Sequence, residues 1–453
     1  MTPKTYVKAM GRSALFVGIA LALTSCSVLE RNRDAREAEE ALEKEGRITM
    51  VLTEARLQPD PTLVSEIITL PAPRSLTEGW SQTGSRASKV PGHVNAAEAL
   101  EIAWRADVGQ GSSNRATLTA PPVTSETAIF TIDASHTLIA TELNSGSRLW
   151  RAQIESSNRR DGLSFGAGLA YHEGRLILAS GFGFVAVFDA SNGAEIWRTQ
   201  TEAPMTGAPT VKDDRIFVSS NNNEILAFSL DEGQVLWSDQ AIAESARVLG
   251  ASSPAAVEEI VVVPYSSGEI IAYLSANGRR LWTEALASAG RFTPISSIND
   301  IGARPVLGGG LVFAGSQSGV LAAIDGRTGN RVWQQPIGTT QAPALAGEYI
   351  FVMGVEAELA CLKAATGQVV WVKELEKFRN SEKKKGRITY AGPIIANGRI
   401  LIVSSQGQLL SMDPQTGEEI ERLKLGSTVY IEPIVALDKL FILTDEARLI
   451  AVR

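Results

Sequence analysis

The chain contains the stretch Gly319-Val320-Leu321-Ala322-Ala323-Ile324-Asp325-Gly326-Arg327-Thr328-Gly329-Asn330-Arg331-Val332-Trp333. Gly329 and Trp333 lie 24 and 28 residues after Pro305, and this spacing recurs along the sequence. The other complete copies are Pro122, Gly146 and Trp150; Pro209, Gly233 and Trp237; Pro254, Gly278 and Trp282; and Pro343, Gly367 and Trp371. Two units are incomplete, because Glu421 follows Pro393 and Gly417 in place of Trp, and Leu169 precedes Gly193 and Trp197 in place of Pro. A fixed frame separated by variable gaps indicates a repeat architecture.

Each repeat is predicted to form four short strands. The repeats start about 44 residues apart, a period typical of four-stranded propeller blades. Within a unit, two apolar runs such as 215–218 and 225–228 are rich in Val, Ile and Phe and are bounded by turn residues. Runs of four or five such residues predict strands, since helices need about ten residues or more. A strand near the proline and a strand ending at Trp complete the unit.

A small residue lies 18 positions after most repeat starts, which predicts close approach of neighbouring blades at this position. Regular recurrence of Trp indicates packing between blades, and a row of ligand-stacking rings is the alternative. The small residues are Ala140, Ala227, Ala272, Ala323, Cys361, Ser411 and Ala451.

The repeats predict a closed ring. There are eight repeat starts, and the last, Pro433, is followed by only 20 residues, which leaves no room for a fourth strand. An unassigned strand-like segment ending at Trp104 precedes the first repeat. Because a ring of sheets leaves no open end, we expect the Trp104 strand to pair with the strand near 449–451. The predicted fold is all-β: residues 98–453 form an eight-bladed β-propeller of four-stranded antiparallel blades, closed by an N-terminal strand in the last blade.

The N-terminus is predicted to be an export signal. Three basic residues precede the ten-residue apolar run 14–23, which is too short to span a bilayer as a mature helix. The run ends in Leu23-Thr24-Ser25-Cys26, which resembles the bacterial lipobox, in which cleavage before the cysteine leaves it to carry lipid. Residues 1–25 are therefore predicted to be a lipoprotein signal peptide, and an ordinary secretory signal with an incidental Cys26 is the alternative. The residue after Cys26 is Ser27. In enterobacterial lipoproteins an Asp at this position favours retention in the inner membrane, so its absence indicates the outer membrane.

Residues 26–97 are predicted to connect the lipidated cysteine to the ring. Residues 30–45 hold eleven charged side chains in sixteen, which favours a solvated helix or flexible tether. The segment 58–75 contains four prolines and is predicted to be an extended linker. The segment 80–93 is predicted to be irregular and to lie against the ring.

Charge and cysteine content limit the partners and the chemistry. The formal net charge is −7 without a large basic domain, so nucleic acid is excluded as a partner. The one basic run, 383–387, lies in a polar insert between blades and is interpreted as a solvated loop, with contact to anionic lipid as the alternative. Cys361, the only cysteine besides Cys26, occupies a small-residue position and is predicted to be buried.

The sequence offers no catalytic or metal-binding pattern. His93, His136 and His172 have no metal-ligand spacing, and no Cys-x-x-Cys, Walker A or Gly-x-Ser-x-Gly element is present. Acidic residues such as Asp325 recur just before the glycine turns, where a side-chain acceptor stabilises the turn. We therefore predict a non-catalytic protein without cofactor or metal.

The units resemble the pyrroloquinoline-quinone-type propeller repeat over residues 98–453. Two groups share this repeat: quinoprotein dehydrogenases, which bind the quinone and calcium at the ring centre, and the BamB family of outer-membrane assembly lipoproteins, which use it as a non-catalytic scaffold. The lipobox, the chain length and the tether before eight short blades resemble the BamB family. Many quinoprotein alcohol dehydrogenases carry an adjacent cysteine pair, which Cys26 and Cys361 do not supply.

The resemblance implies a lipid-anchored scaffold of the Bam complex at the periplasmic face of the outer membrane. It would bind the barrel-forming subunit and assist insertion of nascent outer-membrane proteins, and a periplasmic quinone-dependent dehydrogenase is the alternative. In BamB relatives a Ser-Leu-Arg-Gly loop and the next, acidic inter-blade loop contact the partner. The matching stretches are 246–250 and 298–302, where the arginine is displaced by two positions and one acidic residue remains. The expected contact residues are Arg247, Val248, Leu249, Asn299, Asp300 and Arg304.

Overall fold

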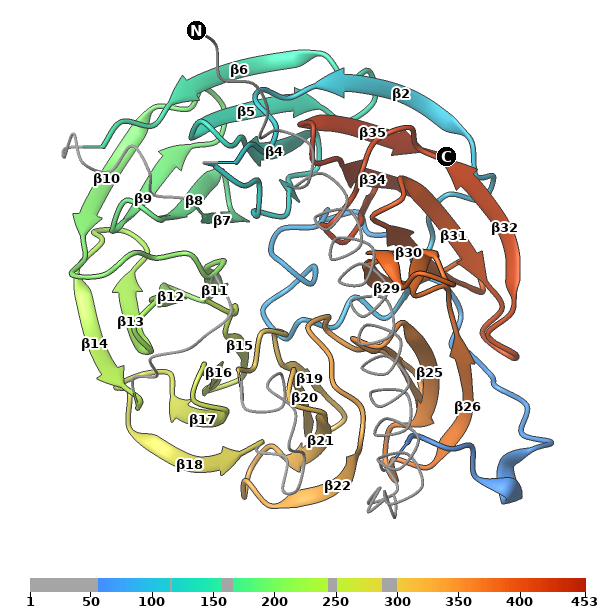
Figure 1. Cartoon of the computed structure of the whole chain (residues 1–453). Helices are drawn as coiled ribbons and strands as arrows, with labels where there is room; N and C mark the ends of the chain where they lie inside the picture. The colour runs from blue at the N-terminus through green and yellow to red at the C-terminus, as the bar shows by residue number, and fades with distance from the viewer. Residues whose placement is uncertain (1–55, 115, 157–165, 243–250, 287–299) are drawn as a thin grey trace, which may run out of the picture. The chain divides into compact units, whose positions relative to one another are not determined.

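The computed structural model describes residues 56–114, 116–156, 166–242, 251–286 and 300–453. Leu57 to Arg453 form one compact unit, and its sheets are arranged as a ring of eight blades (Figure 1). In every blade four antiparallel strands follow one another from the centre to the rim. The prediction of an all-β, eight-bladed propeller is confirmed. The predicted domain boundary lies at residue 98, whereas the first strand of a blade begins at Ile102 and the compact unit begins at Leu57.

The strands of each blade are given from the centre outward. Blades 1 to 4 are β3 (Val123–Thr124), β4 (Ala128–Ile132), β5 (Thr137–Glu142) and β6 (Arg148–Gln153); β7 (Ala167–His172), β8 (Arg175–Ser180), β9 (Phe184–Asp189) and β10 (Glu195–Gln200); β11 (Thr210–Lys212), β12 (Arg215–Ser219), β13 (Glu224–Ser229) and β14 (Val235–Gln240); β15 (Ala255–Val257), β16 (Ile260–Pro264), β17 (Glu269–Leu274) and β18 (Arg280–Ala285). Blades 5 to 8 are β19 (Val306–Gly308), β20 (Leu311–Ser316), β21 (Val320–Asp325) and β22 (Arg331–Gln335); β23 (Ala344–Ala346), β24 (Tyr349–Met353), β25 (Glu358–Lys363) and β26 (Val369–Glu374); β29 (Tyr390–Ala396), β30 (Arg399–Ser404), β31 (Gln408–Met412) and β32 (Glu419–Lys424); β33 (Ile434–Ala436), β34 (Lys439–Leu443), β35 (Arg448–Val452) and β2 (Ile102–Asp107). The remaining elements are the 3-10 helix η1 (Pro61–Leu63), β1 (His93–Val94), β27 (Phe378–Asn380) and β28 (Lys385–Arg387).

The eighth blade combines segments from both ends of the compact unit. Its outermost strand, β2, pairs antiparallel with β35, and Trp104 lies opposite Ala451. On the other side of β2, the Trp104 ring reaches Gly146 of blade 1, where an added Cβ would lie 2.7 Å from it. Blades 8 and 1 are therefore in contact.

The recurrent glycine and tryptophan form the contacts between adjacent blades. Gly329 of blade 5 has φ +76°, and an added Cβ would lie 2.6 Å from the Trp282 side chain of blade 4. The Trp282 indole N–H also donates to the Gly326 carbonyl at 2.9 Å. The glycine thus serves both the left-handed backbone and the close approach of the ring. The same Gly–Trp contact joins Gly146 to Trp104, Gly193 to Trp150, Gly233 to Trp197, Gly278 to Trp237, Gly367 to Trp333 and Gly417 to Trp371.

Most of the small residues lie in apolar clusters that include residues of the adjacent blade, and most of them also lie opposite a tryptophan of their own blade. Ala323 lies opposite Trp333 on the adjacent strand of the same blade, and Cys361 lies opposite Trp371 in the same way. The prediction that the fourth strand ends at Trp is wrong, since β14 continues from Trp237 to Gln240.

One junction lacks both partners of the Gly–Trp contact. Glu421 is exposed and lies opposite Ser411, at the position that Trp occupies in other blades. In the next blade, the residue four positions before Trp104 is Leu100, which is buried, in place of glycine. The missing tryptophan and the missing glycine of the Gly–Trp contact therefore belong to the same junction, between blades 7 and 8. An apolar cluster that includes Leu100, Leu409 and Leu449 fills this part of the ring.

Candidate docking face

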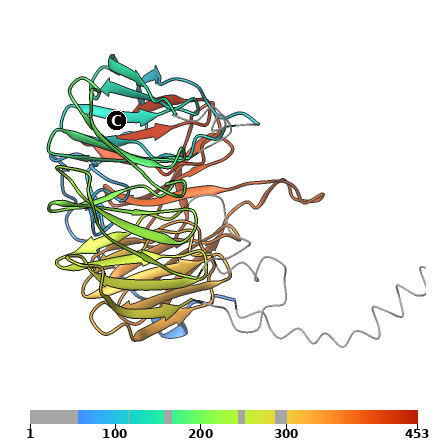
Figure 2. The same cartoon turned by 90° about the vertical axis from the view of Figure 1, so that its left-hand side faces the viewer.

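The chain direction gives the ring two different faces. Each blade runs outward from its first to its fourth strand, so every connector from one blade to the next starts and ends on the same face. We call this the connector face, and it also carries the turns between second and third strands. The opposite face, here the turn face, carries the turns between first and second and between third and fourth strands. Figure 2 shows the ring from the side.

The long connectors between blades start and end on the connector face. Between β18 and β19 the connector has 20 residues (286–305), between β14 and β15 it has 14 (241–254), and between β26 and β29 it has 15 (375–389). On the turn face the links between first and second strands have two residues, as in 213–214, or three, as in 125–127. Loops of variable length on a rigid scaffold are where binding residues concentrate. The connector face is therefore the candidate site.

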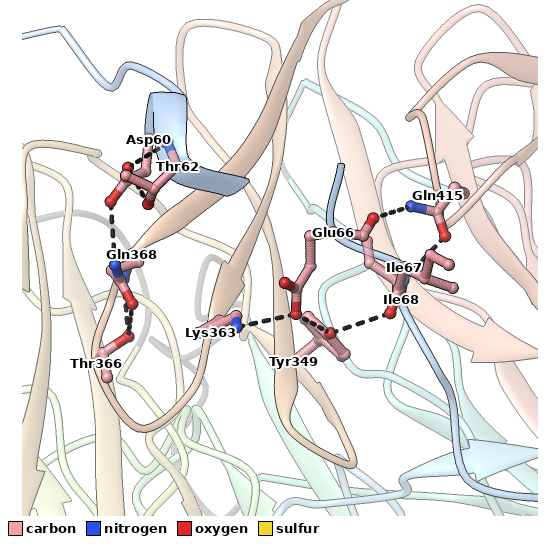
Figure 3. Close-up of polar contacts among 10 residues, drawn as sticks. All are labelled: Asp60, Thr62, Glu66, Ile67, Ile68, Tyr349, Lys363, Thr366, Gln368 and Gln415. Atoms are coloured by element: carbon pink, nitrogen blue, oxygen red, sulfur yellow. Dashed lines mark hydrogen bonds and ion pairs between the residues drawn. The ribbon is translucent and has the colours of Figure 1, made fainter. Parts of the chain in front are cut away.

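The turn face is covered by residues that precede the blades. η1 and the segment after it lie on blades 6 and 7 (Figure 3), where the Glu66 carboxylate contacts Lys363 at 2.9 Å and Tyr349 at 2.8 Å. The hydrogen bonds from Lys363 and Tyr349 lower the pKa of Glu66, whereas burial and the Glu66 charge raise the pKa of Tyr349 to about 12. The side-chain amide of Gln415 in blade 7 donates to the Glu66 carbonyl and accepts from the Ile68 N–H, so it bonds the backbone on both sides of Ile67.

The segment 76–97, here the central segment, then contacts the blades in ring order. It lies at the centre of the ring, as Figure 1 shows, and its backbone hydrogen bonds to the blades go to the first strands or to the turns after them. The Trp80 carbonyl accepts from Thr124 of blade 1, Ser81 from Tyr171 of blade 2, Ala87 from Ala256 of blade 4, Ser88 from Leu307 of blade 5, and the Ala97 N–H donates to Asp438 of blade 8. The innermost strand edges are thereby paired, so this segment belongs to the architecture of the ring.

The central segment makes more specific contacts with blades 3 and 7. The Gln82 side-chain amide donates to the Val211 carbonyl and accepts from the Val211 N–H, both at 2.9 Å, as a paired peptide group would. β1 pairs in parallel with β29, with His93 beside Ile395. The His93 Nε2 accepts from the Gly398 N–H at 2.8 Å, so Nδ1 carries the proton that is donated to the Pro71 carbonyl at 2.6 Å. His93 therefore has a structural role.

A charged cluster lies between the central segment and the ring. Lys89 is 1% exposed, and its Nζ has no hydrogen-bond partner among the described residues. Nearby, Arg304 and Glu432 form an ion pair at 2.7 Å, with side chains 14% and 8% exposed. Burial, followed by the charge of Arg304, lowers the pKa of Lys89 well below its usual value, whereas Glu432 acts in the opposite direction. The sequence did not mark Lys89 or Glu432, because nothing in their local pattern reports burial.

The predicted contact residues fall into two groups. Arg247, Val248, Leu249 and Asn299 lie outside the described residues, as does Cys26. Asp300 is on the connector face but only 4% exposed, and Arg304 is paired with Glu432 beneath the central segment. Partner contact by Arg304, as by the other residues of the set, stays a prediction.

The recurrent turn aspartates and Cys361 have the structural roles that the sequence predicted for them. Asp325 accepts from the Thr328 N–H at 2.8 Å, and Asp189 accepts from Ser191 in the same kind of turn. Burial raises the pKa of the Cys361 thiol, which keeps it protonated and unreactive. These residues stabilise turns and blade packing.

The connector face has two small clefts between neighbouring blades. One is lined by Asp133, His136 and Gly166 among others, and the second by Asn223, Tyr265 and Asp300 among others. Each has a volume of about 10 Å³, which is room for about one water molecule. Within the described ranges, no group of three or more His, Cys, Asp or Glu side chains could hold a metal ion. In the same part of the chain, no helix has the length and apolarity needed to cross a membrane.

Comparison with known proteins places the chain in a family. The family model described as outer membrane protein assembly factor BamB matches residues 134–373 and 356–453. The chain belongs to the BamB family. BamB of Yersinia pestis is 23% identical over 346 residues, which are 75% of this chain and 85% of that protein. BamB of Shewanella oneidensis is 23% identical over 349 residues, which are 76% of this chain and 86% of that protein.

Solved structures share the fold of the chain. The crystal structure of BamB from Moraxella catarrhalis has a TM-score of 0.61 at 17% identity, covering 76% of this chain and 96% of that one. Quinohemoprotein alcohol dehydrogenase from Comamonas testosteroni has a TM-score of 0.62 at 12% identity, covering 81% and 76%. Similarity at this level concerns the propeller alone, because function depends on the site.

The BamB family model does not extend over the central segment. Its matches begin at residue 134, whereas the segment that covers the ring centre comprises residues 76–97. Contacts of Gln82, Ser88 and Lys89 with the blades therefore add to what the family match describes.

Proposed function

We propose that the chain is a non-catalytic, lipid-anchored scaffold of the β-barrel assembly machinery at the periplasmic face of the outer membrane. It binds the barrel-forming subunit and positions it for insertion of nascent outer-membrane proteins. Family membership supports the assembly role. The lipid anchor at Cys26 is supported by the Leu23-Thr24-Ser25-Cys26 sequence.

The observation that carries the docking proposal is the unequal division of the chain between the two faces. The turn face has short links, and residues 57–97 overlie its centre and part of blades 6 and 7, where they are hydrogen-bonded to the blades. The connector face carries the 14-residue and 20-residue connectors on either side of blade 4. These connectors include the stretches 246–250 and 298–302, which match the partner-contacting loops of BamB relatives. We therefore assign docking to the connector face.

The ring is suited to binding without a large conformational change. Blades joined by Gly–Trp contacts and by the central segment form a continuous packed ring, and a rigid scaffold limits the ordering cost of association. The lipid anchor adds local concentration of the chain near its membrane-bound partner. Binding and positioning are then sufficient for the scaffold role.

The residues present do not fit a quinone and calcium site. The described ranges contain no carboxylate cluster suited to calcium, and the chain's two cysteines, Cys26 and Cys361, are far apart in sequence. No dehydrogenase step is derived for this chain.

The proposal is tested by affinity purification of the lipidated chain from detergent-solubilised outer membranes. Recovery of the barrel-forming subunit is expected, and failure to recover any barrel-assembly protein would contradict the scaffold role. Two charge-reversal variants, Arg247→Glu and Asp300→Lys, test whether the connectors on either side of blade 4 contribute to recovery of the subunit. Since Asp300 is 4% exposed, we expect Arg247→Glu to reduce recovery more than Asp300→Lys.

A further inference from the structure

A two-stranded hairpin projects from the connector face between blades 6 and 7. β27 and β28 pair antiparallel, with Phe378 opposite Arg387 and Asn380 opposite Lys385. Figure 2 shows this hairpin extending away from the blades. All residues from Arg379 to Arg387 are exposed. The sequence predicted a solvated polar loop here, and the structure shows an ordered, solvent-exposed arm.

The base of the arm is fixed to the ring. The Arg387 guanidinium donates to the Val355 carbonyl at 2.6 Å and contacts Glu356 at 3.1 Å. Ile388 is buried, and the Tyr390 hydroxyl donates to the Glu376 carbonyl at 3.0 Å. An anchored base holds the tip at a defined place on the connector face.

The tip carries an excess of positive charge. From Lys377 to Arg387 the sequence has six basic residues and one acidic residue, Glu382, on a chain whose net charge is −7. Arg387 and Lys377 contact Glu356, whereas Lys383, Lys384 and Lys385 have no carboxylate within 4.0 Å among the described residues. Lysines are flexible point charges, so they favour an acidic surface over a shaped pocket.

The position of the arm indicates which acidic surface it meets. It stands on the same face as the connectors 241–254 and 286–305, to which the proposed function assigns docking. A protein seated on those connectors faces the arm, since the arm projects from that face (Figure 2). Opposite charges at the rim of an interface accelerate encounter more than they strengthen the final complex.

We propose that the hairpin 377–387 is a second contact for the docked barrel-forming subunit and steers an acidic surface of its periplasmic domains onto the connector face. The proposal rests on the proposed function. It adds a residue set on the connector between blades 6 and 7, away from the matched loops on either side of blade 4.

The test measures association kinetics of the full mature chain with the periplasmic domains of the barrel-forming subunit. The variant Lys384→Glu/Lys385→Glu is compared with Arg279→Glu/Arg327→Glu, which makes the same charge change at exposed positions on the turn face. In low salt we expect the hairpin variant to lower the association rate about tenfold, with little change in dissociation, because steering can contribute about 10-fold to 1,000-fold. The difference should shrink at high salt, where charges are screened.

Three results would overturn the inference. Equal association rates for the hairpin variant and the unmodified chain would exclude the hairpin as a contact but leave the proposed function intact. Equal losses in both variants would show a general charge effect. Absence of any binding by the unmodified chain would refute the proposed function together with the inference.

A parallel measurement separates a lipid surface from a protein partner. Flotation with vesicles of phosphatidylglycerol and phosphatidylcholine is compared for the same variants. If the hairpin variant loses binding to phosphatidylglycerol vesicles while its association rate with the subunit is unchanged, the arm contacts lipid and the inference is wrong. Unchanged flotation together with slower association supports it.

Discussion

Replacement of Gly329 by alanine tests how the ring is held together. Gly329 has φ +76°, and a Cβ there would lie 2.6 Å from the Trp282 side chain of the preceding blade. The left-handed backbone costs a non-glycine residue about 1–2 kcal/mol. Overpacking against the buried ring adds about 1–3 kcal/mol, so the total loss is about 2–5 kcal/mol.

Gly310 of the same blade is the matched control. Its φ is +78°, but no atom lies within 4 Å of an added Cβ. Gly310→Ala therefore carries the backbone cost of about 1–2 kcal/mol without the clash. The difference between the two variants, about 1–3 kcal/mol, isolates the Gly–Trp contact.

The assay is denaturant unfolding followed by tryptophan fluorescence, with midpoints compared at unchanged slope. Trp282→Leu in the Gly329→Ala background should recover part of the loss, because the two residues are in contact and their effects are not additive. Equal losses for Gly329→Ala and Gly310→Ala would refute the proposed role of the frame in joining blades.

Three further predictions concern the ring centre. Because the folded-state pKa of Lys89 is lowered, the unfolded chain binds more protons than the folded chain between that pKa and the unfolded value, so stability rises with pH in this window. Lys89→Met should lose this rise in alkaline unfolding curves, whereas exposed Lys424→Met should keep it. Identical curves for Lys89→Met and the parent would contradict the lowered pKa of Lys89. Trp80→Ala should cost about 3–5 kcal/mol and accelerate amide exchange at Thr124 and Leu307, which donate to the central segment, and unchanged exchange there would show that the segment does not protect the blades. Calorimetry with pyrroloquinoline quinone and calcium should give no binding heat, and saturable heat would reopen the dehydrogenase alternative.

The repeat frame made most of the ring predictable. Pro305, Gly329 and Trp333 are local signals with a fixed spacing, and each blade repeats the same physical requirement for a turn and a large ring against it. Glu421 was visible in the sequence as a missing tryptophan. That its partner glycine is also missing became clear only in the structure, because the placement of Trp104 in blade 8 puts Leu100 at the glycine position.

The centre of the ring was less predictable because its contacts are far apart in sequence. Gln82 bonds to Val211, and Ser88 to Leu307, with no local pattern that reports the partner. The residues 80–93 could be expected only to lie against the ring. The ion pair of Arg304 with Glu432 likewise joins residues 128 positions apart, which no local pattern reports.

Site-specific photocrosslinking in intact membranes tests the docking account most directly. A crosslinker is placed at residue 247 of the connector 241–254 or at residue 384 of the hairpin, and at residue 327 on the turn face as the control. The account predicts crosslinks to the barrel-forming subunit from 247 and 384 and none from 327, read by mass spectrometry. Crosslinks from residue 327 alone, or none from any position in membranes that contain the subunit, would contradict it.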